Sequence, residues 1–291
     1  MKKALKIIGF TLLFLVLITV GFGIYLYQTN DLLRASINND ESKLYYFPSK
    51  EIEDLSDFNT EEVTLTVEDS ISVYHYLFSP NSDSLVGNIF FIHGAGGNAT
   101  TYKELIRPLV ETGFRVYATD WRGYGKSDGT PNYKNVWKDT EAAFADFLSR
   151  TTADSLKTIV YGMSLGGQVA VKLTREYESK IDALVLDGSV ASAQQLAIDY
   201  APIAFLKEDA RAHPEKFNQD YVAEKDISMT EGTPKLIIHS KNDQEVAFSH
   251  GKTLFQNALE PKSFWQTDTK HIMTLSEYPE EAIERIKSLL E

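Results

Sequence analysis

The chain contains no cysteine, so disulfide bonds, thiolate metal sites, iron–sulfur clusters and a cysteine nucleophile are excluded. It also lacks a long basic stretch, and its formal net charge at pH 7 is −12. An acidic chain without a cluster of basic residues offers few binding groups to the phosphates of a nucleic acid, so we expect no nucleic-acid partner. With 43% hydrophobic and 24% charged residues, the composition of the 291 residues is that of a packed globular protein.

Charge is absent from residues 7–30 as well, and residues 7–27 are predominantly apolar. About 20 apolar residues are enough to cross a bilayer as a helix. No small-x-small cleavage site follows, so we predict an uncleaved transmembrane signal anchor over residues 5–27. A cleaved signal peptide is the alternative, whereas a lipoprotein is excluded because no cysteine can carry the lipid.

The basic residues that flank this span predict its orientation. Lys2, Lys3 and Lys6 precede the span, and Arg34 and Lys43 follow it. Because the more basic flank stays in the cytoplasm, we expect a single-pass membrane protein. Its C-terminal domain then lies on the non-cytoplasmic, periplasmic or extracellular side.

Residues 28–60 are polar and mixed, and we expect them to form a stalk ahead of a domain over residues 61–291. That domain opens with two segments of alternating apolar and polar residues, which predict an antiparallel pair of strands at 62–67 and 71–78. Later runs are almost continuously apolar, as strands buried on both faces are; they lie at residues 88–92, 115–119, 158–161, 183–186 and 235–238, with a last strand at 263–266.

Amphipathic patterns lie between these runs and predict helices at residues 101–112, 136–150, 166–178, 249–259 and 279–290. For the first helix we expect a capping box formed by Thr101 and Glu104. Strands that alternate with helices predict an α/β fold, with a mostly parallel central sheet that helices flank on both faces.

A longer segment at residues 191–231 interrupts this alternation with helix- and loop-forming sequence. We expect it to form a short lid over one end of the sheet. The apolar side chains within it are expected to pack the lid against the body rather than to bind substrate; they are Tyr200, Ile203, Phe205 and Leu206.

The first sign of chemistry is the sequence Gly-Met-Ser-Leu-Gly at residues 162–166, which follows a predicted strand and precedes a predicted helix. This is the context of a nucleophile elbow, in which a serine at the apex of a sharp turn is presented to substrate. Glycines on either side let the turn close. Ser164 is therefore the predicted nucleophile.

A serine nucleophile needs a base and an acid that orients the base. His271 lies in a polar loop after the last predicted strand and is the candidate base. The candidate acids are Asp243, which follows the strand at 235–238, and Asp187, which follows the strand at 183–186. We favour Asp243, because the order serine, aspartate, histidine is typical of this architecture.

The other histidines are not assigned chemistry. His93 adjoins a glycine-rich loop and is expected to fix its shape, and His239 is expected to pack in the core. His75, His213 and His250 have the sequence context of the surface or the lid.

Two backbone N–H groups complete the predicted site. Leu165 directly follows the nucleophile at the start of a helix, and Ala95 lies in the loop after His93; their N–H groups are the expected oxyanion hole. The sequence contains no phosphate loop, dinucleotide fingerprint or His-Glu-x-x-His helix, so no cofactor and no metal is expected.

Taken together, these residues resemble the α/β-hydrolase superfamily. The likeness covers roughly residues 62–291 and includes His93-Gly94, the segment from Asp120 to Ser127, the elbow around Ser164, and Asp243 and His271 in that order. The anchor and short lid are similar to those of membrane-anchored ABHD-type hydrolases and the serine aminopeptidase-like branch, which also resembles monoacylglycerol lipases. The resemblance implies an α/β-hydrolase fold and hydrolysis without a cofactor.

Two functional hypotheses follow. The first is a membrane-anchored serine hydrolase that cleaves esters, thioesters or amides of small acyl substrates through an acyl-enzyme, with esterase or lipase chemistry favoured over peptidase chemistry. The second is an α/β-hydrolase fold that binds a partner without catalysis. Fold alone does not imply activity. We favour the enzyme because the sequence supplies a nucleophile, a base, an acid and an oxyanion hole.

Overall fold

The computed structural model describes residues 2–38, 40–68, 70–82, 84–201 and 203–291. The chain divides into two compact units, Met1–Tyr46 and Phe47–Glu291. The first unit consists of the helices α1 (Lys2–Thr29), α2 (Asp31–Asn38) and α3 (Glu41–Leu44).

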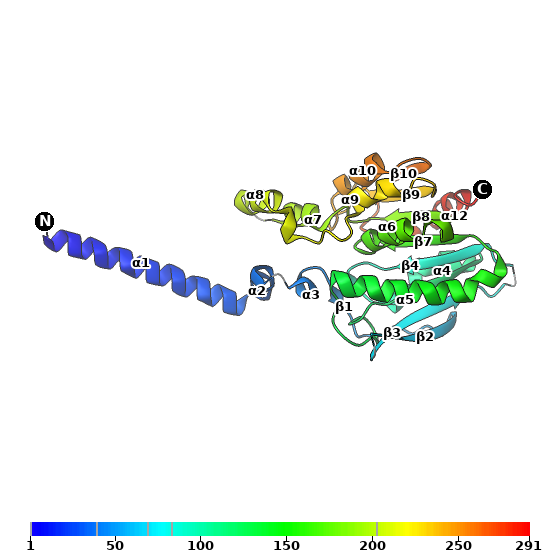
Figure 1. The fold of residues 1–291 in the computed structure, drawn as a ribbon, viewed down its shortest axis with the longest axis horizontal. Coiled ribbons are helices and arrows are strands. Elements are labelled where there is room, and N and C mark those ends of the chain that lie inside the picture. Colours follow the sequence, from blue (N-terminus) through cyan, green and yellow to red (C-terminus); the bar gives the residue numbers. More distant parts are fainter. Residues whose placement is uncertain (1, 39, 69, 83, 202) are drawn as a thin grey trace. The chain divides into compact units, whose positions relative to one another are not determined.

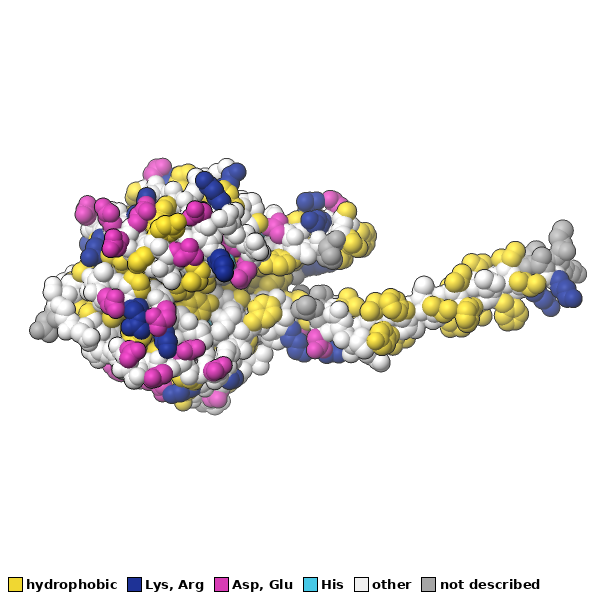
Figure 2. Space-filling view, turned by 180° about the vertical axis from the view of Figure 1, so that it is seen from behind, with side chains coloured by type: hydrophobic (Ala, Val, Ile, Leu, Met, Phe, Trp, Pro, Cys, Tyr) yellow, Lys and Arg dark blue, Asp and Glu magenta, His cyan; other side chains and the backbone are white. Residues whose placement is uncertain are grey.

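Helix α1 carries the apolar stretch predicted as an anchor. Its described side chains from residue 6 to residue 25 are exposed, and hydrophobic side chains line it in Figure 2. The segment Lys6–Thr29 spans 24 residues, a length and composition that suit a membrane span or a signal sequence. The predicted apolar helix is therefore present.

The second unit is built on an eight-stranded sheet with the order β10-β9-β8-β7-β4-β6-β3-β2. Strand β3 pairs antiparallel with β2 and β6, and the other neighbouring pairs are parallel. The strands are β2 (Asn59–Val67), β3 (Ile71–Ser79), β4 (Gly87–Ile92), β6 (Phe114–Thr119), β7 (Thr158–Met163), β8 (Ala183–Asp187), β9 (Lys235–Ser240) and β10 (Lys262–Thr267). The predicted, mostly parallel sheet with its antiparallel opening is confirmed.

Helices cover both faces of this sheet (Figure 1). On one face, α4 (Lys103–Glu111), α11 (Thr274–Glu277) and α12 (Pro279–Ser288) bury apolar side chains against the strands. On the other lie α5 (Tyr133–Thr151), α6 (Gly166–Glu176) and α10 (Phe248–Asn257). There, Phe90 of β4 packs against Phe144 and Phe147 of α5. Burial on both faces explains why the central strands are continuously apolar.

The predicted capping box of the first helix is not formed as expected. Helix α4 follows a 3-10 turn, η1 (Ala99–Tyr102), and the capping box belongs to that turn, between Asn98 and Thr101. Asn98 has the extended backbone that an N-cap requires. Glu104 instead pairs with Arg107 one turn along the helix.

The second unit begins at Phe47, earlier than the expected boundary at residue 61. Strand β1 (Phe47–Pro48) pairs in parallel with β5 (Gly96–Gly97). The Asn98 side chain donates to the carbonyl oxygens of Ser49 and Glu51, at 3.2 and 2.6 Å. These long-range bonds make the end of the expected stalk a part of the body, which a local polar pattern does not reveal.

The predicted lid segment lies between β8 and β9. It contains α7 (Ala193–Tyr200), α8 (Ala204–Ala212), η4 (Pro214–Lys216), α9 (Ala223–Asp226) and η5 (Ile227–Met229), and Figure 1 shows α7 and α8 projecting from the body. The remaining short turns of the unit are η2 (Thr152–Asp154) and η3 (Glu178–Lys180). The segment thus has the helical character that the sequence predicted.

Candidate active site

Ser164 occupies a sharp turn between β7 and α6. Its φ is 51°, in the left-handed region that a non-glycine residue adopts at a cost. The turn is held from both sides, because the Ser164 N–H donates to the Asp187 carbonyl oxygen at 2.9 Å, and the Ser164 carbonyl accepts from the N–H groups of Gly167 and Val190, both at 3.1 Å. This is the geometry of a nucleophile elbow.

Two glycines let this turn pack tightly. A Cβ on Gly166 would lie 2.2 Å from the carbonyl oxygen of His93, and a Cβ on Gly162 would lie 2.5 Å from the Cβ of Ala170. Real side chains do not approach so closely. The glycines of the motif are therefore required by the contact between the elbow, the end of β4 and helix α6.

His271 is hydrogen-bonded to Asp243. The distance from Nδ1 to Oδ2 is 2.6 Å, and the two side chains are 8% and 0% exposed. The other carboxylate oxygen of Asp243 accepts the N–H groups of Glu245 and Val246, both at 2.9 Å. Burial by itself raises the pKa of Asp243, but the contact with His271 and these two N–H groups outweigh it, so that the pKa lies below its ordinary value.

Of the two candidate acids, the structure joins Asp243 and not Asp187 to the imidazole. His239 also lies beside this acid: its Nε2 is 2.9 Å from the Val246 carbonyl oxygen and 3.6 Å from Asp243 Oδ2. His239 is fully buried, as expected for a core residue. It holds the turn that presents the acid.

The residue after His271 has an unusual backbone that sequence reasoning missed. Ile272 has a φ of 53°, which is rare for a β-branched residue. Its Cγ2 lies 2.9 Å from the position of a Cβ on Gly188, and the Nδ1 and Cε1 atoms of His271 lie 3.0 Å from that position. The loop that carries His271 is thus pressed against the end of β8. No local sequence signal marks such a turn.

Ser164 and His271 both border the loop that follows β8. Ser164 binds the backbone of Asp187 and Val190, and the His271 ring lies against Gly188. Among the contacts of the described residues, no hydrogen bond joins Ser164 Oγ to His271. In enzymes without substrate such bonds are often long and tighten when substrate binds.

The two predicted oxyanion donors belong to residues adjacent to Ser164 or to the loop beside it. Ala95 follows Gly94, which lies close to Ser164. A Cβ added to Gly94 would lie 3.1 Å from Ser164 Cβ and 3.6 Å from Ser164 Oγ. Leu165 precedes the first residue of α6, where the helix dipole is positive. Within the described part of the chain, the N–H groups of Ala95 and Leu165 have no hydrogen-bond acceptor. They remain available to an oxyanion.

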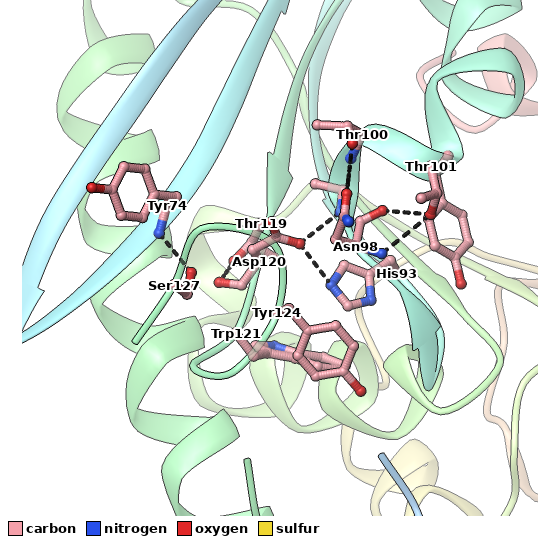
Figure 3. A network of polar contacts seen from close by, with 12 residues as sticks. Tyr74, His93, Asn98, Thr100, Thr101, Thr119, Asp120, Trp121, Tyr124 and Ser127 are labelled. Atoms are coloured by element: carbon pink, nitrogen blue, oxygen red, sulfur yellow. Dashed lines mark hydrogen bonds and ion pairs between the residues drawn. The ribbon is translucent and has the colours of Figure 1, made fainter. Parts of the chain in front are cut away.

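A buried network fixes the loop that carries Ala95 (Figure 3). His93 Nδ1 is 2.7 Å from the Gly94 carbonyl oxygen, and His93 Nε2 is 3.2 Å from Asp120 Oδ1, without hydrogen-bond geometry. Asp120 Oδ1 accepts the N–H of Ala99 at 2.6 Å. The expected role of His93 in shaping this loop agrees with these contacts.

Two tyrosines that sequence reasoning missed also hold the loop. The Tyr102 hydroxyl accepts the Gly94 N–H at 3.2 Å and donates to the Gly96 carbonyl oxygen at 3.1 Å. The Tyr124 hydroxyl donates to the Ala95 carbonyl oxygen at 2.6 Å. Their ring contacts with His93 form only after distant segments pack together.

Two histidines with surface or lid context in the sequence are fully buried. Burial lowers the pKa of His75 to about 3, and its Nδ1 is 3.0 Å from the Thr119 hydroxyl. His250 accepts the Ala191 N–H and contacts Asp199 of α7 at 3.0 Å. Among the described residues, no group of three His, Asp or Glu side chains has metal-binding spacing.

The lid side chains that were expected to pack against the body are largely exposed, although the Tyr200 hydroxyl donates to the Glu245 carbonyl oxygen, in the loop after β9, at 2.7 Å. Their exposed fractions are 62% for Tyr200, 56% for Ile203, 74% for Phe205 and 43% for Leu206. The packing of α7 and α8 uses smaller positions, such as Ala193, Ile198 and Ala210, which are buried.

The structure resembles solved α/β-hydrolases. It matches an esterase, Pf2001, of Pyrococcus furiosus with a TM-score of 0.67 and 19% identity, over 84% of this chain and 97% of that one. A Vibrio vulnificus α/β-hydrolase matches with a TM-score of 0.63 and 23% identity, over 79% and 82% of the two chains. At this identity the likeness shows the shared α/β-hydrolase fold.

Two sequence relatives extend the likeness. The uncharacterized protein YfhR of Escherichia coli K12 is 28% identical over 286 residues, with 94% of each chain covered. The human α/β-hydrolase domain-containing protein 17B is 29% identical over 198 residues, which cover 66% of this chain and 62% of the human one.

A family model described as serine aminopeptidase, S33, matches residues 83–228. This range includes the loop of Ala95, the turn at Ser164 and most of the predicted lid segment. The chain therefore belongs to the serine aminopeptidase S33 family, a family of hydrolases with the α/β-hydrolase fold.

Proposed function

We propose that the protein is a membrane-anchored serine hydrolase that cleaves ester, thioester or amide bonds through Ser164, His271 and Asp243. The observation that carries the proposal is the left-handed turn at Ser164, with a φ of 51°, beside a base that is hydrogen-bonded to a buried acid at 2.6 Å. In a nucleophile elbow the serine takes such a strained backbone at the apex of a strand-to-helix turn, where the surrounding contacts hold it.

In the proposed reaction, His271 Nε2 takes the proton of Ser164 Oγ as this oxygen bonds to the substrate carbonyl carbon. The N–H groups of Ala95 and Leu165 bind the oxyanion that forms. The carbonyl then re-forms, the bond to the leaving group breaks, and His271 gives its proton to the leaving oxygen, sulfur or nitrogen. Water then gives a proton to the same imidazole as its oxygen bonds to the acyl carbon, the bond from that carbon to Ser164 Oγ breaks, and His271 returns the proton to Oγ. Asp243 stays ionised throughout.

The substrate class that we favour is an ester with an apolar acyl chain, as in carboxylesterases and acylglycerol lipases. Support comes from the lid, where Phe205 and Tyr200 are 74% and 62% exposed. Burial of an acyl chain against such side chains is favourable, at about 0.8 kcal/mol for each methylene group. An aminoacyl amide, as the family description suggests for peptidases, is the alternative.

The proposed location is a membrane, with α1 as a single span and the catalytic unit on the non-cytoplasmic side. Support comes from the 24-residue apolar helix, and from the three lysines before residue 7 against Arg34 and Lys43 after the span. Basic flanks are retained in the cytoplasm.

The nucleophile can be tested by changing Ser164 to Ala. Loss of the attacking oxygen should lower kcat by on the order of 10⁴- to 10⁶-fold and abolish labelling by a fluorophosphonate probe, with an unchanged melting temperature. The exposed Ser149 of α5 provides a matched control, and Ser149→Ala should keep full activity and labelling. A wild-type protein that neither reacts with the probe nor hydrolyses any acyl substrate would instead support a binding module.

The acid can be tested by changing Asp243 to Asn. The amide no longer holds His271 in the correct tautomer, so kcat should fall by about 10³- to 10⁴-fold. Asp187→Asn should cost clearly less in the same kinetic assay. If Asp187→Asn lowered kcat more than Asp243→Asn, the catalytic acid would be Asp187, at the end of β8.

The substrate preference can be tested with p-nitrophenyl esters from acetyl to dodecanoyl and with aminoacyl p-nitroanilides. We expect kcat/KM to be highest for medium-chain esters. Phe205→Ser should lower kcat/KM for octanoyl more than for acetyl esters, and it should leave the fold intact because Phe205 is 74% exposed. Faster cleavage of the aminoacyl amides would favour the peptidase branch.

The orientation can be tested by fusing alkaline phosphatase, which is active only outside the cytoplasm, after Glu291 in a bacterial host. We expect an active fusion in the membrane fraction, and an inactive one when a cytoplasmic reporter replaces it. The opposite pattern would place the catalytic unit in the cytoplasm.

A further inference from the structure

The proposed reaction leaves one buried carboxyl group near the site without a role. Asp187 is the last residue of β8 and is 1% exposed. An ionisable side chain that is shielded from water to this degree is uncommon unless a partner or a function retains it.

The backbone of Asp187 and Gly188 contacts Ser164 and His271, the two reacting residues of the proposed mechanism. The carbonyl oxygen of Asp187 accepts the N–H of Ser164 at 2.9 Å. The next residue, Gly188, lies against the imidazole. A Cβ added to Gly188 would be 3.0 Å from His271 Nδ1 and Cε1. The carboxyl Oδ2 of Asp187 accepts the hydroxyl of Tyr161 at 3.0 Å. Tyr161 therefore holds the carboxyl group at a defined position, and the residue that follows Asp187 lies against the base.

Three titratable groups from three different segments interact with this carboxyl group, Tyr161 through its hydrogen bond and Asp243 and His271 through their charges. Tyr161 comes from β7, Asp243 from the loop after β9, and His271 from the loop after β10. Of these, His271 is the group that becomes a cation when it takes the serine proton. An anion at Asp187 would stabilise that cation, because a buried charge pair is screened weakly by solvent.

The geometry points to Asp187 as a positioning residue of the active site, whose carboxylate forms a second negative charge beside His271 and Asp243 and stabilises the imidazolium in the transition state. We propose this role on the basis of the proposed serine hydrolase function. The proton of Ser164 still moves to His271 alone, and Asp187 takes part through its charge.

The environment of Asp187 indicates the pH at which this charge appears. Burial raises its pKa to about 7, although the hydrogen bond from Tyr161 and the nearness of His271 oppose the increase. Below that pH the carboxyl group is neutral and differs little in charge from an asparagine. Above it, the group is an anion and can stabilise the imidazolium.

The test is the pH profile of Asp187→Asn with the best acyl ester of the substrate series. At pH 5.5 the variant should have nearly the kcat of the wild type. At pH 8.5 its kcat should be lower by about tenfold, which corresponds to about one pKa unit of interaction, with KM unchanged. A merely structural aspartate would give the same activity ratio at both pH values, and that result would overturn the proposal.

A second variant keeps the test decisive if Asp187→Asn folds poorly. Tyr161→Phe removes the hydroxyl that donates to Asp187, so the pKa of Asp187 should rise. The increase in kcat that accompanies ionisation of Asp187 should then occur at a pH higher by about one unit. An unchanged profile in this variant would also contradict the proposal.

Asp182→Asn is the matched control, because Asp182 precedes β8 at its other end and pairs with Lys157 near the surface. It removes the same charge and should leave the wild-type pH profile unchanged. Circular dichroism melting curves establish that each variant is folded. If the wild-type protein neither hydrolyses any ester nor reacts with fluorophosphonate, the proposed function fails. If the wild type is active but the ratio of its kcat to that of Asp187→Asn is the same at both pH values, only this inference is refuted.

Discussion

The close contact between the turn at Ser164 and the end of β4 constrains the rest of the site. Gly166 passes so near the carbonyl oxygen of His93 that a Cβ would lie 2.2 Å from it. This contact brings the loop of Gly94 and Ala95 beside Ser164, and among the described contacts the N–H groups of Ala95 and Leu165 have no acceptor. The strain of a left-handed serine is thus offset by packing that also aligns the proposed oxyanion hole.

Three aspartates at or after the carboxyl ends of strands β6, β8 and β9 show how environment separates similar groups. Asp120, which follows β6, accepts the Ala99 N–H and supports the oxyanion loop. Asp243, which follows β9, accepts two backbone N–H groups and His271, so its pKa is lowered. Asp187 ends β8 with the Tyr161 hydroxyl as a donor, and burial raises its pKa to about 7. For Asp243 and Asp187, the number of hydrogen-bond donors and the degree of burial therefore decide the direction in which the pKa moves.

Apolar side chains are exposed in both units of the chain. In α1 they surround a helix of membrane-spanning length, and in the lid they belong to Tyr200, Ile203, Phe205 and Leu206. Exposed apolar side chains of this size favour contact with another apolar phase. In the proposed function a bilayer covers the first set and an apolar acyl chain contacts the second, whereas an aminoacyl substrate would leave the second set without an apolar partner.

The sequence by itself determined the succession of the main strands and helices along the chain and the apolar N-terminal helix, because hydrophobic periodicity is a local property. It also determined the position of the elbow, because the spacing of glycines around Ser164 is local too. It also indicated His271 and two possible acids, since the carboxyl ends of parallel strands meet at one edge. Only the tertiary structure decided that His271 bonds to Asp243, that Ile272 takes a left-handed backbone, and that the body begins at Phe47. These features depend on contacts between segments far apart in the chain, and no local pattern records which distant side chain will lie beside a given residue.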